Sequence, residues 1–184
     1  GYNLATPFQL ATATAVMANR GRWARPRLLM DVIGRDTVHD FLPEDNYEDI
    51  VLDNPDDWNF IIQGMRNVMH GSSGTARAAG RDATYEMAGK TGTSQVRRIS
   101  AQERREGVTD NEDLPWRQRD HALFVGYAPA KAPRYCAATV VEHGGGGSKT
   151  AAPLERDLLE ATLKRDPATR NDLKLSRRTR RETG

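Results

Sequence analysis

The segment AGKTGTSQV, residues 88–96, contains Gly-Lys-Thr, the three residues that end a phosphate-binding P-loop. A P-loop also needs a glycine at the start of its Gly-x-x-x-x-Gly-Lys pattern, because backbone N–H groups must curl around the phosphates. Thr84 stands at that position here, and in HGGGGSKTA the position belongs to His143. Neither segment is a P-loop, so Lys90 requires another explanation.

The sequence around Lys90 favours a strand, because TGTS follows TYEM and is rich in β-branched residues. A strand directs alternate side chains to opposite faces. Lys90, Gly92 and Ser94 are therefore expected on one face, and Thr91, Thr93 and Gln95 on the other.

Such a strand could bind an extended acyl-peptide. An exposed strand edge pairs with a peptide backbone, and Gly92 inside the strand would allow close approach. Lys90 and the hydroxyls of Thr91 and Thr93 could hold a terminal carboxylate, and the backbone N–H of Thr93 could stabilise an oxyanion. A glycine bulge in an ordinary strand is the structural alternative.

Two other groups of reactive side chains fit no known pattern. Ser73 in GSSGT lacks the second glycine of a nucleophile elbow, since Thr75 takes its place. His121 and His143 flank two predicted strands near Glu142, but the irregular spacing matches no zinc motif. We interpret these histidines as structural or surface residues and expect neither a metal nor a cofactor.

Helices are predicted in three places. Residues 5–21 begin with Thr6 as N-cap, Pro7 and Gln9 of a capping box. Residues 54–71 begin with Asn54 as cap and end at Gly71, and residues 150–166 form an amphipathic helix. The apolar faces predicted from helical spacing comprise Leu10, Ala13 and Met17 with Phe8 and Val16; Trp58, Ile61, Ile62, Met65, Val68 and Met69; and Leu154, Leu158, Leu159 and Leu163.

Strands are predicted at residues 84–96, 121–129 and 134–142, with an edge strand at 24–33. The short connection PAKAP makes the last two an antiparallel hairpin. The predicted fold is α+β, an antiparallel sheet flanked by helices. His70, in the last turn of its helix, is interpreted as a helix-dipole partner or a surface residue.

Composition describes a globular chain of 184 residues with 38% hydrophobic content and one cysteine, Cys136, expected to be buried. No window reaches the roughly 18–20 apolar residues of a membrane span.

Two segments are rich in charge. Residues 97–120 carry twelve charged residues among twenty-four, as expected of a functional or mobile loop. Residues 164–184 carry eight Lys or Arg and three acidic residues, and without aromatic residues we interpret this tail as disordered and expect no nucleic-acid partner.

The segment KTGTSQV resembles the third catalytic motif, Lys-Thr-Gly, of the penicillin-recognising serine transpeptidases. Four further segments resemble class B penicillin-binding proteins in the same order: GYNLATPFQLATATAVMANRG, GSSGTAR, DHALFVGYAP and VVEHGGGG. The spacing and the long charged loop are most similar to the cell-elongation type, penicillin-binding protein 2. The resemblance covers residues 1–164, and 165–184 are expected to be a separate basic tail.

The resemblance implies a partial penicillin-binding-protein and β-lactamase-like fold, and roles for four residues. Lys90 would assist proton transfer through the serine of a second motif. Thr91 and Thr93 would bind the carboxylate of a D-Ala-D-Ala stem peptide or a β-lactam, with the Thr93 amide as oxyanion donor, and Gly92 would keep the cleft floor clear. It also implies a periplasmic domain of an inner-membrane protein that crosslinks peptidoglycan. The expected partner of that protein is a membrane glycosyltransferase of the elongation machinery.

The sequence departs from the family in one respect. None of the six serines begins Ser-x-x-Lys or Ser-x-Asn, the motifs of the nucleophile and its helper. The chain also begins at Gly1 without an initiator methionine. We expect the C-terminal part of a transpeptidase domain that needs its missing N-terminal part and has no acyl-transfer activity alone. The alternative is a non-enzymatic binding or scaffold module that uses the charged loop and the basic tail.

Overall fold

Three antiparallel strands form the centre of the molecule. The computed structural model describes residues 4–26 and 47–166, and within them β1 (Ala88–Ser94), β2 (His121–Ala128) and β3 (Tyr135–Val141) lie in the order β1-β2-β3. The predicted hairpin and the α+β class are confirmed. The predicted edge strand lies almost entirely outside the described residues, as does nearly all of the basic tail.

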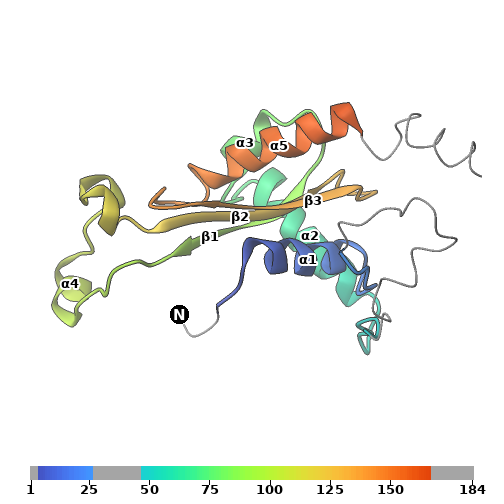
Figure 1. The fold of residues 1–184 in the computed structure, drawn as a ribbon, viewed down its shortest axis with the longest axis horizontal. Helices are drawn as coiled ribbons and strands as arrows, with labels where there is room; N and C mark the ends of the chain where they lie inside the picture. Colours follow the sequence, from blue (N-terminus) through green and yellow to red (C-terminus); the bar gives the residue numbers. More distant parts are fainter. Residues whose placement is uncertain (1–3, 27–46, 167–184) are drawn as a thin grey trace, which may run out of the picture.

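Helices cover both faces of this sheet. Figure 1 shows α5 (Ala151–Arg165) and α3 (Arg77–Arg81) over one face and α1 (Pro7–Ala18) beneath the other. The helix α2 (Asp57–His70) packs beside β1 and contributes to both layers. One core cluster joins Phe124 of β2 to the α5 side, and a second joins Tyr127 to α1 and α2.

The start of α1 was predicted correctly, and its buried face only in part. The Thr6 hydroxyl accepts a hydrogen bond from the backbone N–H of Gln9, whose side chain in turn accepts one from the Thr6 N–H, which completes the capping box. The buried side chains are those of Thr14, Val16 and Ala18, whereas Phe8 and Ala13 are exposed. Apolar residues occur on all sides of this helix, so spacing alone did not identify the packed face.

The second helix begins two residues later than a cap at Asn54 requires. The N-cap is Asp56, because the Asn54 side chain accepts the N–H of Asp56 and its carbonyl accepts the N–H of Asp57. Asparagine thereby forms a turn ahead of the helix instead of capping it. The end at Gly71 is confirmed, and Trp58, Met65 and Met69 are buried on the predicted face, with Ile61, Ile62 and Val68 half-buried.

The predicted apolar face of α5 is wrong for half of its residues. Leu159 is buried and Leu163 packs against the core, but Leu154 and Leu158 are each about half exposed. The helix instead presents Ala151, Ala152 and Glu155 to the sheet. Small alanines let the start of the helix approach the strands closely, which turns the two leucines outward.

The carboxyl group of Glu155 is fully buried under the sheet. Neither of its oxygens has a hydrogen-bond partner among the described residues. Burial raises the pKa of Glu155 to about 8, and the nearby Thr139 offsets only part of this rise. At neutral pH the folded protein therefore holds this side chain mainly as the neutral acid.

This buried acid predicts that stability falls as the pH rises. The unfolded chain loses the Glu155 proton near pH 4.5 and the folded chain near pH 8. The contribution of the protonated Glu155 to the free energy of unfolding is therefore complete below pH 4.5. It decreases by about 5 kcal/mol as the pH rises from 4.5 to 8. We expect Glu155→Gln to remove this loss. Unfolding free energies at pH 5 and pH 9, for the wild type and this variant, test the prediction, and parallel pH dependences would contradict it.

Candidate active site

The Lys-Thr-Gly motif lies on β1, which is an edge strand of the described sheet. Lys90 pairs with Val125 and Thr91 with Phe124 across the ladder to β2. Since Phe124 belongs to the core on the α5 side, the side chain of Thr91 lies on that face and that of Lys90 on the opposite one. The predicted alternation is confirmed from Lys90 to Ser94. No other strand among residues 4–26 and 47–166 pairs with the second edge of β1, so its backbone groups could pair with a partner strand.

The side chain of Lys90 is exposed and is held by its own strand. Its Nζ donates a hydrogen bond of 2.7 Å to the backbone carbonyl of Thr91. No other ion pair or hydrogen bond of Lys90 occurs among residues 4–26 and 47–166. An ammonium group at a strand edge with a single neutral partner can reorient toward an arriving group without breaking a buried ion pair.

Gly92 lies where two other segments approach closely. A Cβ atom at this position would stand 3.2 Å from the Cβ of Leu123. Gly147, from the glycine-rich turn before α5, packs against the same place: its own Cβ would lie 2.4 Å from the Gly92 carbonyl oxygen. The glycine-rich turn therefore packs directly on the motif, a role that the sequence patterns did not reveal.

Thr75 is a second residue that sequence reasoning missed. Its hydroxyl oxygen lies 3.2 Å from the hydroxyl oxygen of Thr91, and either can donate the hydrogen bond. Thr75 belongs to the turn between α2 and α3, and nothing in the spacing of GSSGTAR connects it with a strand sixteen residues away. Only the packing of α2 against β1 brings the two threonines together.

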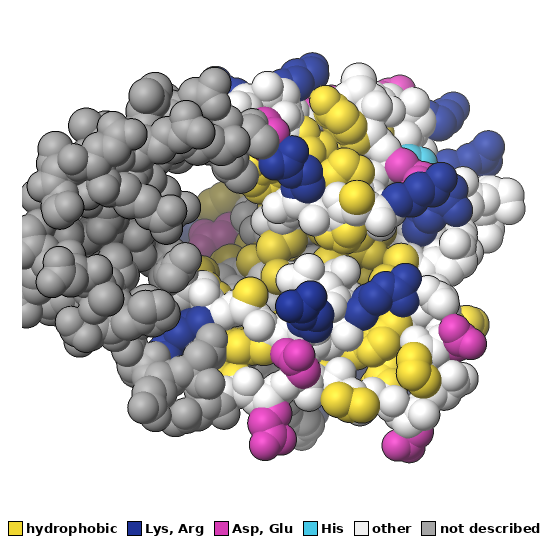
Figure 2. Space-filling view, turned by 90° about the vertical axis from the view of Figure 1, so that its right-hand side faces the viewer, with side chains coloured by type: hydrophobic (Ala, Val, Ile, Leu, Met, Phe, Trp, Pro, Cys, Tyr) yellow, Lys and Arg dark blue, Asp and Glu magenta, His cyan; other side chains and the backbone are white. Residues whose placement is uncertain are grey.

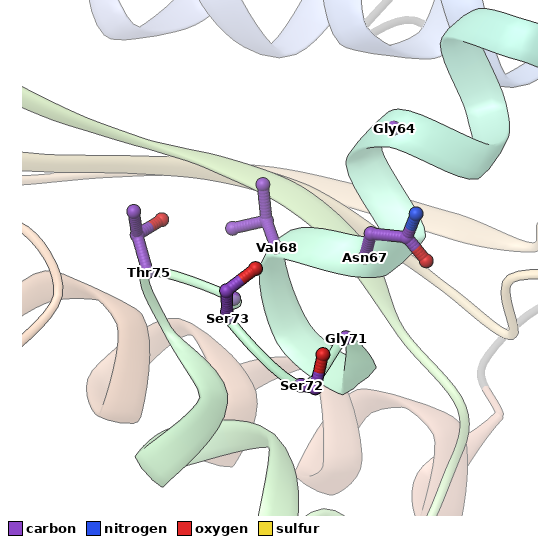
Figure 3. Close-up of a pocket in the computed structure, with 8 residues that line it drawn as sticks. Gly64, Asn67, Val68, Gly71, Ser72, Ser73 and Thr75 are labelled. Atoms are coloured by element: carbon purple, nitrogen blue, oxygen red, sulfur yellow. The ribbon is translucent and has the colours of Figure 1, made fainter.

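The same turn lines a cavity of about 440 Å³ at the end of α2. Figure 3 shows Asn67 and Val68 on the helix, and Ser72, Ser73 and Thr75 on the segment that follows it. Ser72 and Ser73 are exposed turn residues on the rim of this cavity.

The charged excursion between β1 and β2 contains regular structure that was not predicted. It includes α4 (Ala101–Glu106) and the short 3₁₀ turns Asn111–Asp113 and Trp116–Gln118, and Figure 1 places α4 at its tip, away from the helical layers. Arg97 forms an ion pair with Glu103, and this pairing lowers the pKa of that carboxyl group.

The two histidines anchor the end of this excursion. His143 Nδ1 donates to the Arg119 carbonyl at 3.0 Å, and its backbone N–H donates to His121 Nδ1 at 2.9 Å. The ring of Trp116 packs edge-on against His143. These contacts match the interpretation of His121 and His143 as structural residues.

Two other sequence interpretations need refinement. His70 is exposed, as predicted, but its Nε2 also accepts the backbone N–H of Met87 at 3.0 Å and so links the end of α2 to the residue that precedes β1. Cys136 is half-buried instead of buried, with its thiol donating to the Ala11 carbonyl, and burial raises the pKa of this thiol.

This fold and motif define a class of protein. The sequence model for the penicillin-binding protein transpeptidase domain matches residues 1–160, and the chain belongs to that family. The chain is 35% identical over 163 residues to the peptidoglycan D,D-transpeptidase MrdA of Haemophilus influenzae, covering 89% of this chain and 24% of that protein. It is 38% identical to MrdA of Acinetobacter baumannii, covering 89% and 23%. The chain thus spans about a quarter of the length of these relatives.

Solved structures agree with this assignment. The crystal structure of Pseudomonas aeruginosa PBP2 in complex with WCK 5153 superposes with a TM-score of 0.69 at 40% identity, over 88% of this chain and 31% of that one. PBP2 of Helicobacter pylori, in a complex with MreC, gives 0.67 at 26% identity, over 89% and 26%. Within the residues described here, no helix has the length and apolar character to cross a membrane.

Proposed function

We propose that this chain forms the Lys-Thr-Gly side of the active site in a peptidoglycan D,D-transpeptidase of the cell-elongation type. The whole enzyme would bind penicillin and crosslink stem peptides by serine acyl transfer. The observation that carries the proposal is the Lys-Thr-Gly motif on an edge strand, in a chain of this family.

The reaction divides between this chain and a nucleophile that its sequence lacks. A serine of an upstream Ser-x-x-Lys motif would bond to the carbonyl carbon of the D-Ala-D-Ala amide, whose C–N bond breaks as the leaving amine takes a proton. Lys90 would move protons through the serine of a Ser-x-Asn motif. The amide of Thr93 would stabilise the oxyanion, which is worth on the order of 10²–10³ in rate for one such donor.

Substrate binding would use the edge of β1 that does not face β2. An extended stem peptide adds to this edge by backbone pairing. The hydroxyls of Thr91 and Thr93 would donate to its terminal carboxylate or to that of a β-lactam. Gly92, which leaves no side chain above the strand, would keep the floor of the cleft clear.

Several large apolar side chains are exposed on the surface of the chain, which supports a further segment that covers them. Leu4 is 95% exposed and Phe60 82%, and Phe8 on α1 is also exposed. Figure 2 shows apolar side chains reaching the surface between Lys and Arg side chains on one face of the molecule. A contiguous apolar patch, unlike a single exposed apolar side chain, is typical of a surface that another segment covers. We propose that the N-terminal part of the same transpeptidase domain covers these side chains.

The whole protein would act at the periplasmic face of the inner membrane with a glycosyltransferase of the elongation machinery. PBP2 of Helicobacter pylori has been solved in a complex with MreC. An MreC-like protein is therefore a further candidate partner of the whole protein.

Covalent labelling with a fluorescent penicillin tests the proposal. We expect labelling of a polypeptide extended upstream through Ser-x-x-Lys and Ser-x-Asn, and none of the present chain, with circular dichroism showing that both are folded. Labelling of the present chain would contradict the assignment of the nucleophile to an upstream segment. If neither folded polypeptide is labelled, the transpeptidase proposal is wrong and the binding-module alternative is favoured.

A further inference from the structure

We propose that Thr75 is a positioning residue for carboxylate binding, because its hydroxyl directs the hydroxyl hydrogen of Thr91 toward the ligand. The inference deepens the proposed function and rests on its assignment of Thr91 to the carboxylate. The observation behind it is the hydroxyl–hydroxyl distance of 3.2 Å between these two residues.

The direction of this hydrogen bond follows from what each group can donate. A threonine hydroxyl has one hydrogen to donate, and an ionised carboxylate only accepts. If Thr91 donates to the carboxylate, it has no hydrogen left for Thr75, so Thr75 must be the donor in the bound state. The chain then runs from Thr75 to Thr91 to the carboxylate, and each bond in such a chain polarises the next.

The turn that carries Thr75 is held firmly enough to position a hydroxyl. The backbone N–H of Ala76 donates to the Val68 carbonyl at 2.9 Å, and the Ala76 side chain is buried in the core. On the other side of Thr75, the N–H of Gly74 donates to the Gly71 carbonyl at 3.1 Å. A Cβ at Gly74 would lie 2.4 Å from the Asn67 carbonyl oxygen, so the turn is packed tightly against the end of α2.

Thr75 itself is suited to adjustment at an active site. Its residue surface is exposed although its neighbour Ala76 is buried, and its side chain lies on the rim of the cavity in Figure 3. Removing the hydroxyl therefore alters the partner of Thr91 without opening a hole in the core. Thr75→Val keeps the shape of the side chain, and Thr75→Ser keeps the hydroxyl.

The test compares acylation of the full-length protein by benzylpenicillin and by its methyl ester, which lacks the carboxylate. We expect Thr75→Val to lower the second-order acylation constant for benzylpenicillin about three- to tenfold, the usual net effect of one hydrogen bond, through weaker initial binding. The ester should be unaffected. Thr75→Ser should restore the wild-type constant, and Ser73→Ala, which removes a hydroxyl from the same turn, should leave it unchanged.

A double-mutant cycle distinguishes the positioning role of Thr75 from the assignment of Thr91 to the carboxylate. In a Thr91→Val background, Thr75→Val should have no further effect, because its hydrogen-bond partner is gone. If Thr75→Val weakens benzylpenicillin and the ester equally, or neither, the positioning role is wrong while the function of the strand stands. If Thr91→Val leaves the ratio of the acylation constants for benzylpenicillin and its methyl ester unchanged, Thr91 does not bind the carboxylate. The positioning role of Thr75 is then also wrong.

Discussion

Replacement of Lys90 by alanine is expected to slow acylation of the full-length protein by a β-lactam about 10²–10⁴-fold, the range for loss of one group that transfers protons in the transition state. The fold should remain intact, because this exposed side chain makes one described hydrogen bond, from Nζ to the Thr91 carbonyl. Stopped-flow acylation and thermal unfolding of the same sample measure the two effects separately.

Lys90→Arg is the matched control for charge. Arginine keeps a cation at the strand edge but does not release its proton in proteins. We expect this variant to retain part of the β-lactam binding and to acylate as slowly as the alanine variant. Acylation at the wild-type rate in Lys90→Ala would remove Lys90 from the proposed mechanism.

Replacement of Gly147 by alanine is expected to destabilise the protein by about 3 kcal/mol, the upper part of the range for overpacking. The added Cβ would lie 2.3 Å from the Leu123 carbonyl oxygen and 2.4 Å from that of Gly92. Both oxygens belong to the β1–β2 pair, so either the turn or the sheet has to move. Because Gly92 belongs to the motif, acylation should slow as well.

Gly146→Ala provides the control from the same glycine run. A Cβ at Gly146 would meet no atom within 4 Å, so this variant should unfold within about 0.5 kcal/mol of the wild type. Urea unfolding of both variants, with acylation measured alongside, tests the close approach. Equal stabilities for the two variants would show that the turn does not pack on the strand.

The order and type of most elements could be predicted from the sequence alone, because their signals are local. The Thr6 capping box, the glycine that ends α2 and the short connection between β2 and β3 each depend on residues a few positions apart. The placement of Lys90 in a strand followed from β-branched neighbours in the same way. The cap at Asn54 was the exception, since an asparagine can form a turn before a helix as readily as cap it.

The buried faces of the helices and the residues around the motif depend on how the elements pack. The apolar sides of α1 and α5 could not be assigned from spacing, and a buried glutamate in place of leucines on α5 was not predictable. Thr75 reaches Thr91, and Gly147 reaches Gly92, across separations that no local pattern encodes. Capping and strand propensity act along the chain, whereas close packing and hydroxyl partners depend on which elements meet in space.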